Sequence, residues 1–220
     1  MPRRARTTTG AAFSAAAALL LTACGGSDNS SSDDTKATDA RPSSPSVSAA
    51  VSSSTPSDDV QRPVITLPSN FQLTFENWKS GDPVKQAVLN DAKEELRAGY
   101  AAIIANEPDG GTALAFYDTN TAIMQSQQWI KTYTSKNLTV FGKLPAFDPK
   151  VILSADKKAA SLSYCTDESK AYTRNRKTKE VLGNPAGTDP HVSYVVSLGK
   201  NTQGVWQNVS TKGERGDCSR

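Results

Sequence analysis

The chain has 220 residues and a formal net charge of +3. Arg3, Arg4 and Arg6 account for this excess, because the rest of the chain holds 22 Lys and Arg residues against 22 Asp and Glu residues. A chain without a basic surplus lacks the electrostatic footprint of nucleic-acid-binding proteins, so we expect no nucleic-acid partner. No segment beyond residue 24 provides the run of about 18 apolar residues that a membrane-spanning helix needs.

The first residues have the organisation of an export signal: a cationic start, then an apolar stretch over residues 11–21 that is too short to span a bilayer. Leu21, Thr22, Ala23 and Cys24 follow. This sequence resembles the lipobox of bacterial lipoproteins, in which a diacylglycerol is attached to the cysteine thiol and the signal is cut off before it. The resemblance implies a signal peptide over residues 1–23 and a mature chain held by lipid, such as palmitate, on the extracytoplasmic face of the cell membrane. A plain secretory signal is the alternative. The residues that carry this resemblance are Leu21, Thr22, Ala23 and, as the lipid attachment site, Cys24.

Residues 24–70 are rich in Ser, Thr, Asp and Pro, and from Gly25 onward they contain no Phe, Tyr, Trp, Leu or Ile before Ile65. Such a segment buries too little apolar area to offset the entropy of ordering it, so we predict a disordered tether. A single domain of about 150 residues follows over residues 71–220, a length that suits one hydrophobic core.

Helices are predicted first in this domain. Asp82 and Pro83 form a strong helix start, because an aspartate caps the helix and proline fits its first position. Apolar residues then recur at helical spacing, with Glu94, Glu95 and Arg97 off that stripe, until a cluster of breakers over residues 106–111. A short helix over residues 112–117 and a third helix over residues 121–136 follow.

After Asn137 the pattern changes to the alternation of strands. The expected strands cover residues 138–147, 151–153, 159–165, 171–181, 191–198 and 205–210. The alternation breaks at residues 207–209, where a bulge would restore it. Helices followed by strands indicate an α+β fold with an antiparallel sheet.

The chain contains a series of distinctive segments at Tyr117 and at residues 137–142, 163–167, 204–206 and 216–218. In this order and spacing they resemble the secreted and lipoprotein branch of the nuclear-transport-factor-2-like (SnoaL-like, cystatin-like) superfamily found in actinobacteria. The resemblance implies an α+β cone, with N-terminal helices packed on a curved antiparallel sheet and a pocket between the sheet and the long helix. It implies no reaction, because enzymes, binding modules and structural subunits share this fold.

Two cysteines remain once Cys24 is assigned to lipid. Cys165 and Cys218 form an even pair in an exported chain, where disulfides persist, so we predict a bridge between them; two free buried thiols are the alternative. His191 is the only histidine, and two sulfurs with one imidazole leave a zinc shell incomplete. We therefore expect no metal and no cofactor.

The candidate pocket residues are aromatic side chains together with the single histidine. His191 lacks an obvious partner to orient it as a base, and the strand alternation turns it away from Tyr194. We therefore assign no catalytic residue and expect a non-catalytic domain that binds a small apolar ligand or an envelope protein. The competing function is a small isomerase- or dehydratase-type enzyme that uses an Asp, His or Tyr pair. The pocket candidates are Tyr100, Tyr117, Trp129, His191 and Tyr194.

Residues 174–179 concentrate four positive charges. Lysines on a solvated hairpin or an edge strand are a common protection against unwanted strand pairing. The functional interpretation is contact with anionic wall polymers or lipid head groups.

Overall fold

The computed structural model describes residues 60–218. The predicted signal peptide, the predicted lipobox with Cys24 and residues 24–59 of the predicted tether lie outside these residues. The described elements are β1 (Phe71–Phe75), α1 (Pro83–Ala105), α2 (Gly111–Tyr117), α3 (Asn120–Thr134), β2 (Leu138–Leu153), β3 (Ala159–Asp167), β4 (Lys170–Asn175), β5 (Val181–Leu182), β6 (His191–Lys200) and β7 (Trp206–Arg215).

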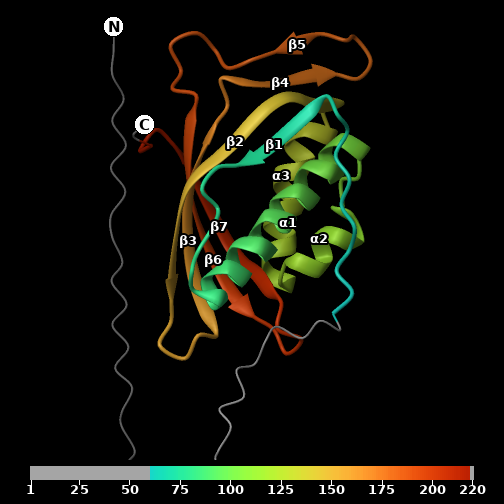
Figure 1. The fold of residues 1–220 in the computed structure, drawn as a ribbon. Coiled ribbons are helices and arrows are strands. Elements are labelled where there is room, and N and C mark those ends of the chain that lie inside the picture. Colours follow the sequence, from blue (N-terminus) through green and yellow to red (C-terminus); the bar gives the residue numbers. More distant parts are fainter. Residues whose placement is uncertain (1–59, 219–220) are drawn as a thin grey trace, which may run out of the picture. The chain divides into compact units, whose positions relative to one another are not determined.

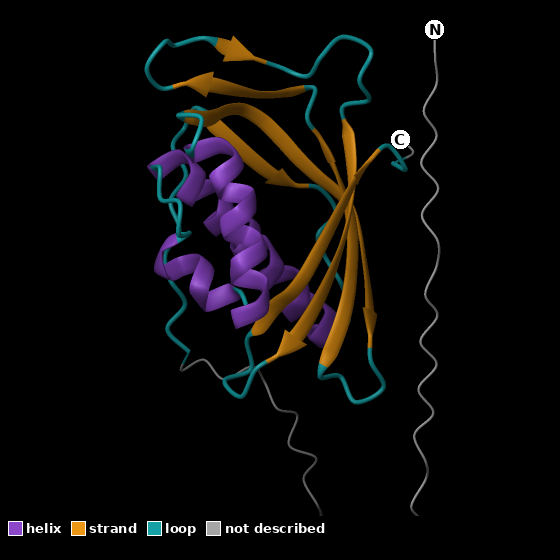
Figure 2. Cartoon of the chain, turned by 180° about the vertical axis from the view of Figure 1, so that it is seen from behind, coloured by secondary structure: helices purple, strands orange, loops and turns teal. Residues whose placement is uncertain are grey.

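The strands form one strongly curved sheet, and the three helices lie against its concave face (Figure 1). The strand order is β5-β4-β2-β3-β6-β7, and the pairs along this path are antiparallel. Figure 2 shows the same two layers from behind, with the helices packed inside the bend of the sheet. The predicted α+β cone, with N-terminal helices on a curved sheet, is confirmed.

The helix boundaries follow the sequence signals. The Asp82 side chain accepts hydrogen bonds from the backbone N–H groups of Val84 and Lys85, and this capping starts α1. Asn106 ends α1 in the left-handed conformation, which asparagine tolerates better than most residues. Thr119 caps α3 through the N–H of Ala122.

The two strands predicted before residue 154 are one strand of 16 residues, β2. Its first half pairs with β4 and its second half with β3, with a bulge between Phe147 and Lys150. At Gly142 the backbone has φ +98°, and a Cβ atom there would lie 2.2 Å from the carbonyl oxygen of Lys170. The glycine and the bulge let a single strand bend and change partners, which curves the sheet.

Two further differences and one confirmed prediction concern the outer strands of the sheet. The sequence analysis predicts no strand at residues 71–75, where β1 pairs in parallel with β2. The strand predicted over residues 171–181 is two strands, because the Asn175 side chain accepts hydrogen bonds from the N–H groups of Lys177 and Thr178 and closes a turn. The bulge predicted in β7 is present: Ser210 and Asn208 pair with neighbouring residues of β6 and leave Val209 as the extra residue.

Residues 60–70, which the prediction places in the tether, pack on the domain. The Arg62 guanidinium donates a hydrogen bond of 3.0 Å from Nε to the buried carboxylate of Asp91. Ile65 is buried in the core, and its carbonyl oxygen accepts a hydrogen bond from Arg97. The packed domain therefore includes the segment from Val60, ahead of the predicted boundary at residue 71.

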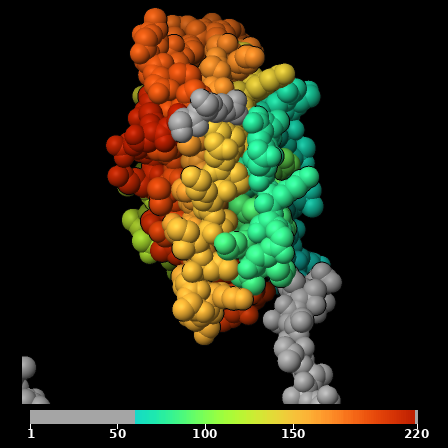
Figure 3. Space-filling model, turned by 60° about the vertical axis from the view of Figure 1, so that its left-hand side comes forward, coloured from blue at the N-terminus to red at the C-terminus, as the bar shows by residue number. Residues whose placement is uncertain are grey.

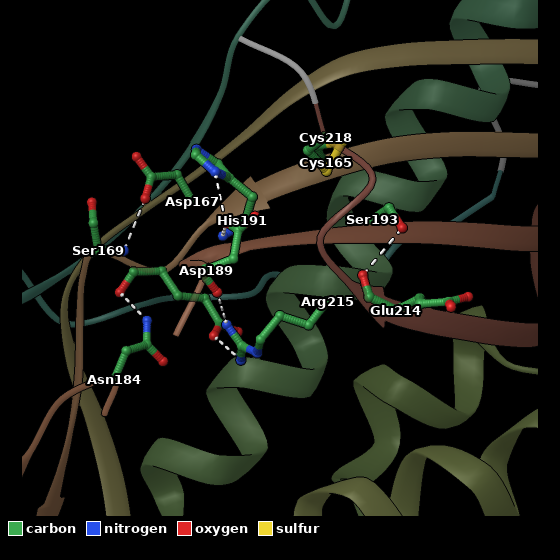
Figure 4. A network of polar contacts seen from close by, with 11 residues as sticks. Cys165, Asp167, Ser169, Asn184, Asp189, His191, Ser193, Glu214, Arg215 and Cys218 are labelled. Carbon is green, nitrogen blue, oxygen red and sulfur yellow. Dashed lines mark hydrogen bonds and ion pairs between the residues drawn. A yellow bond between two sulfur atoms is a disulfide. The ribbon is translucent and has the colours of Figure 1, made fainter. Parts of the chain in front are cut away.

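The disulfide joins Cys165 of β3 to Cys218, with 6.1 Å between the two Cα atoms and a sequence separation of 53. It holds the end of the described chain against the sheet, close to the first residues of β6 (Figure 4).

Replacing both cysteines, Cys165→Ser with Cys218→Ser, should lower the free energy of unfolding by about 4 kcal/mol, because the bridge restricts a loop of this size in the unfolded chain. Denaturant titration of the variant and of the reduced native chain measures the change. A loss below about 1 kcal/mol in both samples would show that the bridge is not a stabilising crosslink.

Candidate functional site

A cavity of about 420 Å³ lies between α1, α3 and the strands β3, β6 and β7. Aromatic rings make most of its apolar wall, and four ionisable or amide side chains add polar groups to it. The aromatic wall consists of Tyr100, Trp129, Tyr164 and Tyr194; the polar groups are Glu95, Gln125, Glu168 and Arg215; the remaining lining residues are Leu96, Ser126, Val192, Thr211 and Gly213.

The cavity exists because large aromatic side chains fill one end of the cone, whereas at the other end the aromatic rings pack closely against glycines. Trp78 and Trp206 are at most 1% exposed and pack solidly under the N-terminal half of α1. At the open end, Gly99 of α1 lies directly against the Trp129 ring, and Gly213 of β7 lies against Tyr194. A Cβ atom at either glycine would approach these rings to within 3.0 Å, so the rings sit back against the walls and leave the centre free.

Ring contacts fix the wall in place. Tyr194 stacks on Tyr164 with 5.1 Å between the ring centroids. Tyr100 meets Trp129 edge-on at 5.2 Å, and Trp129 meets Tyr133 in the same way at 5.9 Å. Such contacts add to the stability from apolar burial, so the cavity has a preformed aromatic lining.

Glu95 lines one corner of the cavity, and a second carboxyl group, that of Asp118, is buried beside it outside the lining. Glu95 of α1 is half-buried and accepts a hydrogen bond of 3.4 Å from the Asn208 side chain. Asp118 is only 4% exposed, and neither of its oxygens accepts a hydrogen bond of good geometry, although Ser126, Asn208 and Glu95 lie beside it. We call Glu95, Asp118 and Asn208 the acid corner.

Burial and the nearby Asp118 raise the pKa of Glu95 to about 8, and burial raises the pKa of Asp118 to about 6. At neutral pH Glu95 therefore retains a proton, and its carboxyl group can donate a hydrogen bond to a molecule in the cavity. The two carboxyl groups titrate as a pair, because a proton on one favours the charge on the other.

An ion pair marks the opposite side of the cavity. Arg215 of β7 reaches Glu168 at 2.6 Å and also donates a hydrogen bond to the carbonyl oxygen of Asp189 (Figure 4). Tyr100, Glu168 and Arg215 also line a second hollow of about 220 Å³, which extends toward β4 and β5. The ion pair therefore lies on the boundary between the two hollows.

The structure brings three of the five predicted pocket residues together. Tyr100, Trp129 and Tyr194 line the cavity. Tyr117 is fully buried outside it, where burial raises the pKa of this tyrosine to about 12. His191 also lies outside the cavity, because the first residue of β6 faces the outer side of the sheet.

The ring of His191 pairs with Asp189 at 3.0 Å (Figure 4). The same ring packs edge-on against Phe147. The Asp189 side chain is half exposed. An Asp–His pair is therefore present, but it lies away from the aromatic cavity and has no access to a molecule bound there.

The helical pattern of the sequence does not identify the acid corner. It places Glu95 off the buried stripe of α1, yet Glu95 lies three residues after Ala92 and four before Gly99, both of which are buried. This spacing was the available signal. Asp118 directly follows the short helix predicted over residues 112–117, and its burial depends on the pairing of its backbone with Asn208 in β7.

Two negative findings concern residues 60–218. No group of three or more His, Cys, Asp or Glu side chains in this range is arranged to hold a metal ion. None of the described helices is long and apolar enough to cross a membrane.

Replacing Glu95 by Gln should change how stability depends on pH. The folded state holds the Glu95 proton up to a higher pH than the unfolded chain, so the native protein loses stability as the pH rises from about 4.5 to about 8. In thermal unfolding followed by circular dichroism, the melting temperature of Glu95→Gln should be close to that of the native chain at pH 5 and higher than that of the native chain at pH 8. The partly exposed neighbour Glu94→Gln is the matched control, and an equally steep pH dependence in Glu95→Gln would contradict this assignment.

No protein-family model matches the sequence, and no curated protein matches it. Solved structures do resemble the chain. The protein Aln2 from a Streptomyces species is 13% identical, with 62% of this chain and 94% of that chain covered and a TM-score of 0.43.

Two further structures show a similar degree of likeness. A ketosteroid isomerase-like protein from Erwinia carotovora atroseptica is 12% identical over 59% of this chain and 93% of that chain, with a TM-score of 0.40. The intermembrane space region of the chloroplast protein ARC6 is 10% identical over 58% of this chain and 93% of that chain, also with a TM-score of 0.40. At these values the assignment of the cone rests on this chain's own sheet and helices.

Proposed function

We propose that the protein is a bacterial surface lipoprotein whose cone domain binds a small, mainly apolar molecule without converting it. The observation that carries the binding proposal is the preformed cavity of about 420 Å³ walled by four aromatic rings. This volume lies within the usual range of small-molecule sites, which are largely apolar with a few well-placed polar groups.

The walls define the chemistry of the ligand. The rings of Tyr100, Trp129, Tyr164 and Tyr194 suit a flat or cyclic apolar body. The protonated carboxyl group of Glu95 favours a neutral hydrogen-bond acceptor, such as a carbonyl or ether oxygen, at the acid corner. A carboxylate at that position would lie beside Asp118 and would be repelled once Asp118 ionises.

The geometry favours binding over catalysis. The Asp189–His191 pair lies outside the cavity, and the hydrogen bond that Glu95 accepts comes from the amide of Asn208 rather than from a tyrosine that it would orient. The acid corner nevertheless supports one competing function, in which Glu95 and Asp118 pass a proton to a bound substrate in an isomerase- or dehydratase-type reaction.

These two functions can be distinguished by identifying the small molecule that co-purifies with the native chain and the one that co-purifies with Glu95→Gln. Pure binding leaves the same molecule in both proteins, because Gln keeps the shape and polarity of the corner. An enzyme whose proton transfer is blocked would instead retain its substrate, so that the variant would yield a different molecule from the native chain.

Filling the cavity tests the binding proposal itself. Val192→Phe places a ring inside the cavity, whereas Val195→Phe makes the same change on the exposed face of the same strand, where Val195 is 49% exposed. Fluorescence titration with the neutral aromatic probe phenylnaphthylamine should show at least tenfold weaker binding for Val192→Phe and native binding for Val195→Phe. Equal binding by both folded variants would show that the probe does not occupy this cavity.

The anchoring part of the proposal rests on the lipobox residues Leu21–Cys24. Cys24→Ser removes the thiol that carries the lipid, and lipid-anchored proteins depend on two or more acyl chains for stable membrane attachment. The variant should lose incorporation of an alkyne-labelled palmitate and leave the membrane fraction, whereas Thr22→Ser, which keeps a small residue there, should behave like the native chain. Equal labelling of Cys24→Ser and native chain would overturn the anchor.

A further inference from the structure

The strands β4 and β5 form an arm at one end of the sheet, beyond the helices (Figure 1). In the space-filling view this segment makes up the upper end of the molecule (Figure 3). It exposes apolar side chains to solvent, although polar side chains would suit a hairpin that contacts only water. Tyr172 is 36% exposed, Val181 48% and Leu182 52%. These exposed apolar groups are the first observation.

Positive charges surround these apolar groups. Lys143 of β2 lies opposite Lys170 of β4, and Arg174 lies opposite Val181 across the next strand pair. Between residues 170 and 183 the sequence has five cations and a single acid, Glu180. Within residues 60–218, no ion pair joins an acid of the domain to any of these cations: Lys143, Lys170, Arg174, Lys177 and Lys179.

The arm is held in one conformation. The Arg174 guanidinium lies 4.2 Å from the centroid of the Phe141 ring, which stacks on Tyr172 at 5.5 Å. Arg176 donates hydrogen bonds to the carbonyl oxygens of Ile103 and Ile104, so it ties the hairpin to the C-terminal end of α1. The exposed face is therefore ordered before any partner binds, which lowers the entropic cost of docking.

We propose that this face docks on an anionic lipid bilayer. We call it the hairpin face and define it as Lys143, Lys170, Tyr172, Arg174, Lys177, Lys179 and Val181, with Leu182 beside it at the exposed edge of the arm, where it pairs with Thr173 on the opposite side of the strand. Cations are attracted to anionic lipid head groups, and tyrosine and aliphatic side chains enter the interface below them. Soluble anionic polymers would account for the cations alone, whereas the exposed Val181 and Leu182 fit a surface with an apolar layer.

The position of the hairpin face gives docking a structural consequence. Tyr172 and Leu182 also line the second hollow, which shares Tyr100, Glu168 and Arg215 with the aromatic cavity. A domain docked through this face would hold the rim of the second hollow against the lipid. The docking itself does not depend on what the cavity binds.

Vesicle co-sedimentation tests the proposal on the chain from residue 24 onward with Cys24→Ser, which carries no acyl group. The chain should bind vesicles of phosphatidylcholine with phosphatidylglycerol at least tenfold better than vesicles of phosphatidylcholine alone. The charge variant Lys170→Gln/Arg174→Gln/Lys177→Gln and the apolar variant Val181→Ser/Leu182→Ser should each lose at least tenfold of this binding. Thermal unfolding confirms that both variants are folded.

The matched control is Lys157→Gln/Lys158→Gln/Lys200→Gln, which removes three exposed lysines at the opposite end of the sheet and should bind vesicles like the native chain. Absence of binding to anionic vesicles would overturn the proposal. So would loss in the control as large as in the charge variant, which would indicate unspecific attraction. Native-like binding by the apolar variant, with competition by soluble polyphosphate, would show that the face binds a polyanion instead.

Discussion

The buried carboxylate of Asp91 fixes the position of α1, and the cavity depends on that position. Asp91 is 2% exposed, and it accepts one hydrogen bond from Arg62 and another, at 2.9 Å, from the backbone N–H of Trp206. It thus joins the long helix to the first described segment and to the last strand. Removing one partner of a buried charge is strongly destabilising, so this three-way contact sets how far α1 stands from the concave face of the sheet.

Asp91 and Glu95 are one helical turn apart on α1 but lie in opposite electrostatic situations. The Arg62 guanidinium compensates the charge of Asp91, whereas Glu95 has only the amide of Asn208 and a second carboxyl group beside it. One helix face therefore holds a stable anion at the packed end of the cone and a neutral acid at its open end. This difference makes the first group structural and leaves the second available to a ligand.

The fold was predictable from the sequence because its signals are local. The Asp82 cap, the proline after it and Asn106 delimit α1, and strict alternation gives the inner face of β6. The parallel strand β1 was not predictable from five residues without a turn signal, since its pairing depends on β2. The continuity of β2 through two prolines likewise depends on its partners, because the strand changes its neighbour where the ladder is interrupted.

The candidate site was only partly predictable for a different reason. A sequence shows which aromatic residues a domain holds, but the volume between them follows from the helix–sheet distance and from close contacts at Gly99 and Gly213. Tyr100 and Tyr117 therefore look alike in the sequence, although one lines the cavity and the other is fully packed. His191 was expected to face away from Tyr194, and the register of β6 places it on the outer side.

The central claim is that the aromatic cavity holds a small molecule in the cell. Native mass spectrometry of the full chain, extracted from its own membrane in mild detergent, tests it most directly. We predict a non-covalent mass increment beyond that of the proposed acyl anchor, from an apolar molecule small enough for about 420 Å³. A protein that carries only its anchor, and that takes up no molecule when mixed with an extract of that membrane, would contradict the account.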